Sequence, residues 1–268
     1  MKASFAALVA HREQVTPLHV LLRLHAPSLA SEARPGQFVH VRVTEACDPL
    51  LRRPFSVMRT EPATGLVDVL FQVVGRGTEA LAQVVEGQTL DLLGPLGTPF
   101  PLPTGGSVVL VAGGVGVAPL VFLAEALAES PTDYGLTGLF GARTESLLCC
   151  WLELAARCSE FEAVTEDGSL GRPGLVTEAL AERLSIAPHP PTVYACGPLP
   201  MLAEVARLCA QAQATAYVSL EHWMGCGVGA CLGCVVPARR EGWPRYVRVC
   251  HEGPVFAAQY LDWEAMLA

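Results

Sequence analysis

Four cysteines towards the C-terminal end of the chain have a spacing that suits metal chemistry. Cys226, Cys231 and Cys234 form a C-x4-C-x2-C pattern, and Cys250 follows after fifteen more residues as a candidate fourth ligand. This is the spacing of plant-type [2Fe–2S] centres, which transfer one electron at a time. Four glycines lie in the same stretch: Gly225, Gly227, Gly229 and Gly233. They would let the loop wrap closely and aim backbone N–H groups at the sulfurs, which tunes the reduction potential.

A structural zinc site and a disulfide pair are the alternatives for these cysteines. Zinc also takes four thiolates, but its ligands usually come as two close couples, and only Cys231 and Cys234 are such a couple. The apolar run in residues 1–14 is a weak mimic of a signal peptide, but residues 15–27 continue it as a second strand after a turn. Without an export signal we expect a cytoplasmic chain with reduced thiols. The spacing favours the cluster and leaves the other two interpretations open.

The remaining cysteines share no ligand spacing. We expect them to be small buried hydrophobes. They are Cys47, Cys149, Cys150, Cys158, Cys196 and Cys209.

A glycine turn lies near the middle of the chain. Residues 108–128 (VVLVAGGVGVAPLVFLAEALA) predict a buried strand, a turn with Gly113, Gly114 and Gly116, and a helix with Pro119 in its first turn. Free N–H groups at such a helix start favour a pyrophosphate. The full G-x-G-x-x-G fingerprint is absent, so a tight strand–helix turn is the structural alternative.

Two motifs in the first hundred residues could hold a phosphate and a ring system together. They are RRPFS at residues 52–56 and GRGT at residues 75–78, and they combine arginine, hydroxyl and aromatic groups. Standing alone, each motif would fit a surface ion pair or a turn equally well. The only lysine is Lys2, so a Walker-type phosphate loop is excluded and phosphate contacts must come from arginine or backbone N–H groups.

The elements around these motifs change in type along the chain. Short β-rich runs before residue 100 predict an antiparallel barrel or sandwich. They cover residues 19–26, 37–43, 54–60, 66–74 and 88–95. After them, strands alternate with helices, which predicts a doubly wound parallel sheet. The expected strands are 107–114, 134–142, 161–167, 192–198 and 216–221, and the expected helices are 120–129, 147–158, 176–184 and 201–212.

The chain therefore divides into residues 1–100, 101–221 and 222–268. The last segment is too short to bury a core of its own and needs a ligand or a neighbouring domain to order it.

The net charge of −8 argues against nucleic acid or an anionic membrane as the main partner. The long uncharged stretch after Asp91 is broken by glycine and proline, so we expect no membrane span.

Taken in this order, the motifs resemble those of the ferredoxin reductase superfamily. Residues 53–56 resemble its R-x-[YF]-[ST] flavin motif, residues 114–119 its nicotinamide-side glycine turn, and ACGP at 195–198 its second nicotinamide signature. The cysteine stretch 219–237, with VCHEGPVF after it, narrows the resemblance to electron-transfer subunits of bacterial NAD-dependent dihydroorotate dehydrogenases. This resemblance covers essentially the whole chain. One departure is Phe55, where many members carry Tyr; ring stacking is kept but a phenol hydrogen bond is lost.

The resemblance implies which residues contact the cofactors. FAD would be contacted by Arg53, Pro54, Phe55 and Ser56 on one side and by Leu70, Phe71, Gln72, Gly77 and Thr78 on the other. NAD, as a substrate, would contact Gly113, Gly114, Gly116, Pro119, Cys196, Gly197 and Pro198. Cys226, Cys231, Cys234 and Cys250 would hold the [2Fe–2S] cluster. No side chain is expected to be catalytic, because the cofactors carry the redox chemistry.

The resemblance also implies a partner. The chain would pass electrons between NAD and a separate FMN-containing catalytic subunit, in a heterotetramer with two copies of each, during de novo pyrimidine biosynthesis. A stand-alone NADH-dependent flavin and iron–sulfur reductase is a second hypothesis, and a zinc-stabilised binding module is a third. We expect NADH rather than NADPH, since Arg143 is the only cation after the second predicted parallel strand.

Overall fold

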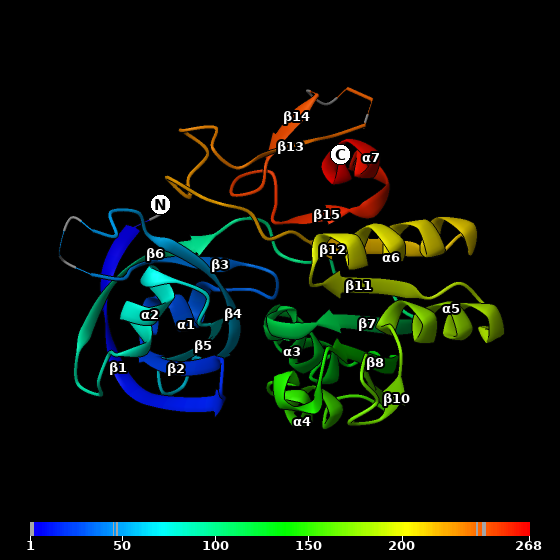
Figure 1. Cartoon of the computed structure of the whole chain (residues 1–268), viewed down its shortest axis with the longest axis horizontal. Coiled ribbons are helices and arrows are strands. Elements are labelled where there is room, and N and C mark those ends of the chain that lie inside the picture. The colour runs from blue at the N-terminus through cyan, green and yellow to red at the C-terminus, as the bar shows by residue number, and fades with distance from the viewer. Residues whose placement is uncertain (1–2, 45, 47, 240, 243–244) are drawn as a thin grey trace.

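The computed structural model describes residues 3–268 except 45, 47, 240, 243 and 244. The blue and cyan N-terminal part forms a barrel, the green and yellow part forms a sheet covered by helices, and the C-terminal segment lies along one side of both (Figure 1). Cys47 lies outside the described residues.

The N-terminal part is a closed antiparallel barrel, which is one of the two architectures that its short β-rich runs predict. Its strands, in spatial order, are β1 (Ala3–Thr16), β2 (His19–His25), β5 (Leu66–Gln72), β4 (Arg53–Glu61), β3 (Phe38–Arg42) and β6 (Thr89–Leu96). Buried and accessible residues alternate along β6, as expected for a strand with one face towards a core. Two short helices connect barrel strands: α1 (Pro27–Glu32) and α2 (Arg76–Ala82).

The second sheet is parallel, as predicted, apart from one edge strand. Its spatial order is β10 (Arg172–Pro173), β9 (Glu160–Thr165), β8 (Gly135–Ala142), β7 (Ser107–Gly113), β11 (Thr192–Cys196), β12 (Thr215–Ser219) and β15 (Val255–Ala257). The edge strand β15 comes from the C-terminal segment and pairs antiparallel with β12. The C-terminal segment therefore extends the sheet of the preceding domain.

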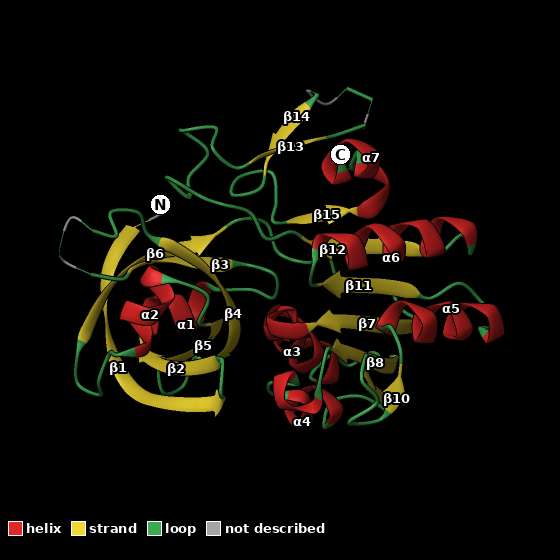
Figure 2. Cartoon of the chain, in the orientation of Figure 1, coloured by secondary structure: helices red, strands yellow, loops and turns green. Residues whose placement is uncertain are grey.

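Helices cover both faces of this sheet (Figure 2). On one face, α3 (Val117–Ala128) and α4 (Trp151–Ala155) pack on Val108 and Leu110 of β7. On the other face, α5 (Val176–Ile186) and α6 (Leu199–Gln211) pack on Val109 and Val111. Successive residues of β7 are buried on opposite faces because strand side chains alternate, and this explains its continuous apolar run.

The barrel and the sheet domain meet where α3 packs against β4. Arg59 on β4 donates from Nε to Oε1 of Glu125 on α3 at 2.7 Å. In the connection after the barrel, the Pro101 carbonyl accepts a hydrogen bond of 2.7 Å from the buried Tyr194 hydroxyl on β11. These contacts fix the barrel relative to the carboxyl ends of the parallel strands.

The C-terminal segment depends on both domains, as its small size predicts. It contains the hairpin of β13 (Val235–Pro237) and β14 (Tyr246–Arg248), then β15 and α7 (Trp263–Leu267). At the end of the barrel, the Thr98 N–H donates to the Gly253 carbonyl at 2.7 Å. Several apolar side chains of the segment share one core with the sheet, among them Val236, Val249 and Phe256.

One predicted helix is wrong in length. The helix expected over residues 147–158 is reduced to α4, because the chain before it is irregular and Cys150 has φ of +52°. A non-glycine residue in the left-handed region interrupts the helical hydrogen-bond ladder. Among the cysteines predicted to be buried, Cys149, Cys150, Cys196 and Cys209 are buried and Cys158 is half-buried. Among the described residues, no helix has the length and apolar character needed to cross a membrane.

Candidate functional site

The first pair of cysteines lies in the loop before β13. Backbone N–H groups of Val228, Ala230 and Cys231 point at the sulfur of Cys226, at N–S distances of 3.5, 3.3 and 3.4 Å. Burial opposes ionisation of Cys226, but these N–H groups and a hydrogen bond from the Cys231 side chain outweigh it and lower the pKa of the thiol to about 6. The thiolate is the form that binds a metal.

The second pair, Cys234 and Cys250, lies on either side of the hairpin of β13 and β14. The sulfurs of Cys234 and Cys250 are 3.2 Å apart, and the N–H of Gly229 donates to the Cys250 sulfur at 3.1 Å. All four cysteines are free thiols, and this spacing is well above the ~2.05 Å of a disulfide bond. Burial is the main cause that raises the pKa of Cys250, to about 12.

The four thiols are arranged as two couples, Cys226 with Cys231 and Cys234 with Cys250. Within the described residues, no three His, Cys, Asp or Glu side chains form a group that could hold one metal ion. A structural zinc ion needs four ligands around a single point, whereas a binuclear iron centre takes two thiolates on each iron. The two couples are compatible with the two thiolates that each iron of a [2Fe–2S] cluster takes.

Glycine and an ion pair shape this loop. Gly229 has φ of +82°, and a Cβ there would lie 2.9 Å from Cδ2 of His251. Its carbonyl accepts a hydrogen bond of 2.9 Å from Arg248, which is also paired with Glu252. The Arg248 guanidinium is the main cause that lowers the pKa of Glu252 to about 2. Sequence reasoning missed both charged residues, although they lie within two residues of Cys250.

The two barrel motifs come together in space. Arg53 begins β4, and a Cβ on Gly77 in the first turn of α2 would lie 2.7 Å from its Nε. The hydroxyl of Thr78 accepts the N–H of Val74 at 2.9 Å and that of Gly75 at 3.1 Å, which orders the start of α2. A guanidinium beside the start of a helix is an arrangement that suits a phosphate.

The other residues expected to contact FAD differ in accessibility. Pro54, Phe55 and Ser56 are half-buried on β4. Leu70 and Phe71 on β5 are fully buried: Leu70 packs in the core shared with α3, and Phe71 packs inside the barrel. The rings of Phe55 and Phe71 have centroids 5.3 Å apart. Phe71 thus supports the motif from behind.

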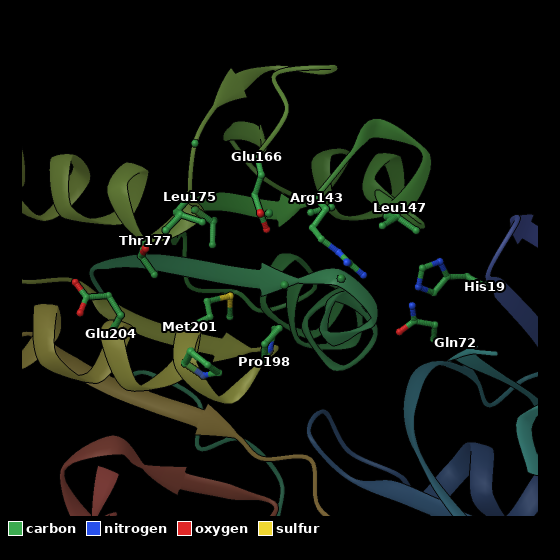
Figure 3. Close-up of a pocket in the computed structure, with 17 residues that line it drawn as sticks. His19, Gln72, Arg143, Leu147, Glu166, Leu175, Thr177, Pro198, Met201 and Glu204 are labelled. Atoms are coloured by element: carbon green, nitrogen blue, oxygen red, sulfur yellow. The ribbon is translucent and has the colours of Figure 1, made fainter. Parts of the chain in front are cut away.

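A cleft of about 570 Å³ opens at the carboxyl ends of the parallel strands (Figure 3). Gly113, Gly114 and Pro198, all expected to contact NAD, line it together with Gln72 from the barrel. Open α/β sheets bind their ligands at this edge. The cleft therefore joins the glycine turn to one of the residues expected to contact FAD.

The remaining residues expected to contact NAD pack below this lining. A Cβ on Gly116 would lie 2.3 Å from the carbonyl oxygen of Cys196, and one on Gly197 would lie 2.6 Å from Cε of Met201. Pro119 and Cys196 are buried. Burial, and secondly the charge of Glu221, raise the pKa of the Cys196 thiol. These residues bring two strand ends together and do not offer side chains to the open cleft.

Known protein families match each part of the chain. An oxidoreductase FAD-binding domain matches residues 7–100, an oxidoreductase NAD-binding domain matches residues 110–207, and the iron–sulfur cluster binding domain of dihydroorotate dehydrogenase B matches residues 221–262. The electron transfer subunit of dihydroorotate dehydrogenase B (NAD(+)) from Desulforamulus reducens is 42% identical over 98% of this chain and 100% of its own length. The chain belongs to this family of electron transfer subunits. The subunit from Geobacillus thermodenitrificans is 41% identical, with 88% of this chain and 90% of its own covered.

The fold is similar to that of solved flavoenzymes. A structure described as NADH-dependent reduced ferredoxin-NADP oxidoreductase, studied for flavin-based electron bifurcation, has a TM-score of 0.86 and 31% identity over 100% of this chain and 93% of its own. The Amycolatopsis cytochrome P450 reductase GcoB has a TM-score of 0.65 at 23% identity, over 80% of this chain and 68% of its own, and shows the fold alone. As a member of the dihydroorotate dehydrogenase B family, the chain is a flavin- and iron–sulfur-dependent oxidoreductase subunit with domains for FAD, NAD and an iron–sulfur cluster.

Several residues that line the cleft were not identified from the sequence. They include His19, Glu166, Thr177, Met201 and Glu204, and Figure 3 shows Arg143 extending into the cleft on the side where His19 and Gln72 lie. Glu166 directly follows β9, so its position after a parallel strand is a signal that could have found it. His19 is buried, its Nδ1 lies 2.7 Å from the Thr16 hydroxyl, and burial lowers its pKa.

Proposed function

We propose that the chain relays electrons between NAD and a separate catalytic subunit through FAD and a [2Fe–2S] cluster held by Cys226, Cys231, Cys234 and Cys250. One observation carries this proposal: the paired cysteines lie in a loop that rests on the barrel beside the strand with the flavin motif. The loop covers the outer face of β3 at Gly227, and β3 pairs with β4. The cysteine loop thus rests on β3, and the flavin motif lies on the neighbouring strand β4. This proximity favours direct electron transfer between the two redox sites.

The barrel residues would hold FAD in a defined orientation. The guanidinium of Arg53 and the start of α2 at Gly77 would bind its phosphates, and Phe55 and Ser56 would lie against its ring system, with Pro54 beside them. When bound, the flavin exchanges two electrons with NADH and single electrons with an iron–sulfur centre. The protein supplies position and electrostatics, and no side chain acts as a catalytic acid or base.

The cleft would hold the nicotinamide nucleotide. Its pyrophosphate would bind the backbone of Gly113 and Gly114 at the start of α3, where free N–H groups favour anions. One arginine, Arg143, lines the cleft with the carboxylates of Glu166 and Glu204. This balance of charge suits the ribose hydroxyl of NADH better than the phosphate of NADPH.

The surface around the cysteine loop supports a protein partner. Its exposed apolar side chains are Trp223, Val228, Leu232, Val235 and Tyr246, and Trp223 is 89% exposed. Exposed aromatic and aliphatic groups next to a redox centre are typical of a docking surface. We propose that the partner is the FMN-containing catalytic subunit of dihydroorotate dehydrogenase, in a cytoplasmic complex with two copies of each subunit.

We also propose the division into a flavin barrel at residues 1–100, an NAD domain at 101–221 and a cluster segment at 222–268. The barrel strands end at Leu96 and the first strand of the second sheet begins at Ser107, which supports the first boundary. The second boundary falls just after β12, although β15 returns to pair with it.

The variant Cys231→Ser tests the relay. This exposed cysteine is part of the first couple, so the variant should lose the cluster while FAD stays bound and NADH still reduces it. Electron transfer to the catalytic subunit should then fail, measured as orotate formation from dihydroorotate and NAD⁺ in the assembled complex. Cys158→Ser is the matched control, because Cys158 lies outside the loop. Orotate formation at the wild-type rate by Cys231→Ser would refute the assignment of the cluster to this relay.

A second candidate partner is favoured by one observation. The solved structure with 31% identity over the whole chain is described as an NADH-dependent reduced ferredoxin-NADP oxidoreductase. If reduced ferredoxin is the partner, the chain would accept electrons from reduced ferredoxin. It would then give no dihydroorotate oxidation with an FMN-containing subunit. Assaying the same preparation with both donors separates the two candidates.

A further inference from the structure

His40 is a fully buried histidine on the outer face of the barrel. It lies in the middle of β3, opposite Pro54 on β4 and Leu93 on β6. Its neighbours Val39 and Val41 point into the barrel core, so the alternation of strand side chains places His40 on the other face. Phe38, two residues earlier, packs in the core shared with the C-terminal segment.

The cysteine loop covers the imidazole ring. A Cβ on Gly227 would lie 2.6 Å from Nδ1 of His40, 3.2 Å from its Cγ and 3.3 Å from Cδ1 of Leu96. Gly227 has φ of +70°, so both the conformation and the space require glycine at this point. Gly227 directly follows Cys226, and the loop backbone therefore meets the barrel through the ring of His40.

The ring has no ordinary hydrogen bond. Within the part of the chain that the structure describes, neither Nδ1 nor Nε2 of His40 has a hydrogen-bond partner, and both atoms are buried. The backbone carbonyl groups of Arg52 and Cys226 are the polar groups near the ring. An imidazole has at least one N–H to donate. Buried polar groups without a partner are rare in native proteins, which indicates a specific role.

We propose that His40 is a positioning residue for the iron–sulfur loop: its buried ring is the polar contact through which the barrel sets the position of Cys226 and of the iron bound there. This inference rests on the proposed function, since it requires a cluster in the loop. An N–H group aimed at a cluster loop stabilises the added negative charge of the reduced cluster. His40 therefore raises the reduction potential of the cluster and holds it beside the strand that carries the flavin motif.

The test compares two variants of the full chain loaded with FAD and cluster. His40→Leu removes both ring nitrogens, whereas His40→Asn keeps an amide nitrogen near the position of Nδ1. We expect His40→Leu to make one-electron reduction of the cluster about tenfold less favourable, which is a potential more negative by about 59 mV, and to change its electron paramagnetic resonance spectrum. His40→Asn should stay close to wild type in both measurements. The rate of flavin reduction by NADH should be unchanged in both variants.

Val41→Ala is the control for damage to β3, because Val41 is buried on the same strand but faces the barrel interior. Equal potentials and spectra for His40→Leu and wild type would overturn the proposal, and so would equal shifts in His40→Leu and His40→Asn. If His40→Leu retains too little iron for a titration, the proposal requires that His40→Asn and Val41→Ala retain it, and equal loss in His40→Asn overturns it. Absence of a [2Fe–2S] spectrum from the wild-type chain would instead refute the proposed function.

Discussion

Replacing Gly116 with alanine should damage the nucleotide cleft without touching either redox centre. The added Cβ would lie 2.3 Å from the carbonyl oxygen of Cys196, 2.5 Å from its carbonyl carbon and 2.8 Å from the nitrogen of Gly197. All three atoms are backbone, so no side-chain rotation can relieve the contact. Ordinary van der Waals contact begins near 3.4 Å, so the turn after β11 must move by about 1 Å.

The size of the effect follows from this displacement. Overpacking of a rigid core costs roughly 1–3 kcal/mol, and we expect the upper part of this range because only backbone can move. The displaced turn carries Pro198, which lines the cleft. A shift of ~1 Å in a positioning element costs as much as ~100-fold in rate, so kcat/KM for NADH should fall by about 10- to 100-fold.

Gly114→Ala is the matched control in the same turn. A Cβ there would meet no protein atom within 4 Å, but φ is +54°, so in unfolding measurements without nucleotide the variant tests backbone strain alone. The left-handed conformation costs about 1–2 kcal/mol, and the stiffer unfolded chain returns about 0.4–1 kcal/mol of this. We therefore expect Gly114→Ala to lose about 1 kcal/mol, less than Gly116→Ala.

The assay is NADH-dependent reduction of ferricyanide, with thermal unfolding and the flavin and iron contents measured in parallel. Gly116→Ala should keep its FAD and cluster, lose NADH efficiency and unfold several degrees lower. Wild-type kcat/KM in Gly116→Ala, or a larger loss of stability in Gly114→Ala, would refute the steric reasoning.

Three further predictions follow from the charges and the partner. The wild-type chain should prefer NADH to NADPH by at least about tenfold in kcat/KM, because Arg143 shares the cleft with two carboxylates; a preference for NADPH would contradict this. Glu252→Gln should lower the free energy of unfolding, because the pKa of Glu252 is about 2 in the folded protein, below the 4.5 of the free group. The stabilisation by this carboxylate is therefore complete above pH 4.5 and is lost as pH falls through about 2. Urea unfolding should give a constant difference from wild type between pH 8 and pH 5, and a smaller one below pH 4.5. The loaded chain alone, given dihydroorotate and NAD⁺, should form no orotate until an FMN-containing subunit is added; steady orotate formation without it would exclude a pure electron-transfer role.

Much of the fold is encoded in short stretches of sequence. The barrel and the parallel sheet were predicted from the order of the elements, because short β-rich runs come first and strands that alternate with helices follow. The prediction for residues 147–158 was wrong because an apolar run does not reveal the left-handed conformation at Cys150. The edge strand β15 is only three residues long, and its pairing with β12 depends on contacts far apart in the sequence.

For the candidate site, the sequence by itself determined what is local. The spacing of Cys226, Cys231 and Cys234 requires only a short loop, and the glycine turn before α3 requires only its own backbone conformation. The tertiary structure alone decided the contacts between distant segments: the pairing of Cys250 with Cys234, the approach of Arg53 to Gly77, and the burial of His40 under Gly227. The physical reason is that spacing and φ are properties of a few neighbouring residues, whereas these contacts depend on how the barrel, the sheet and the C-terminal segment pack together.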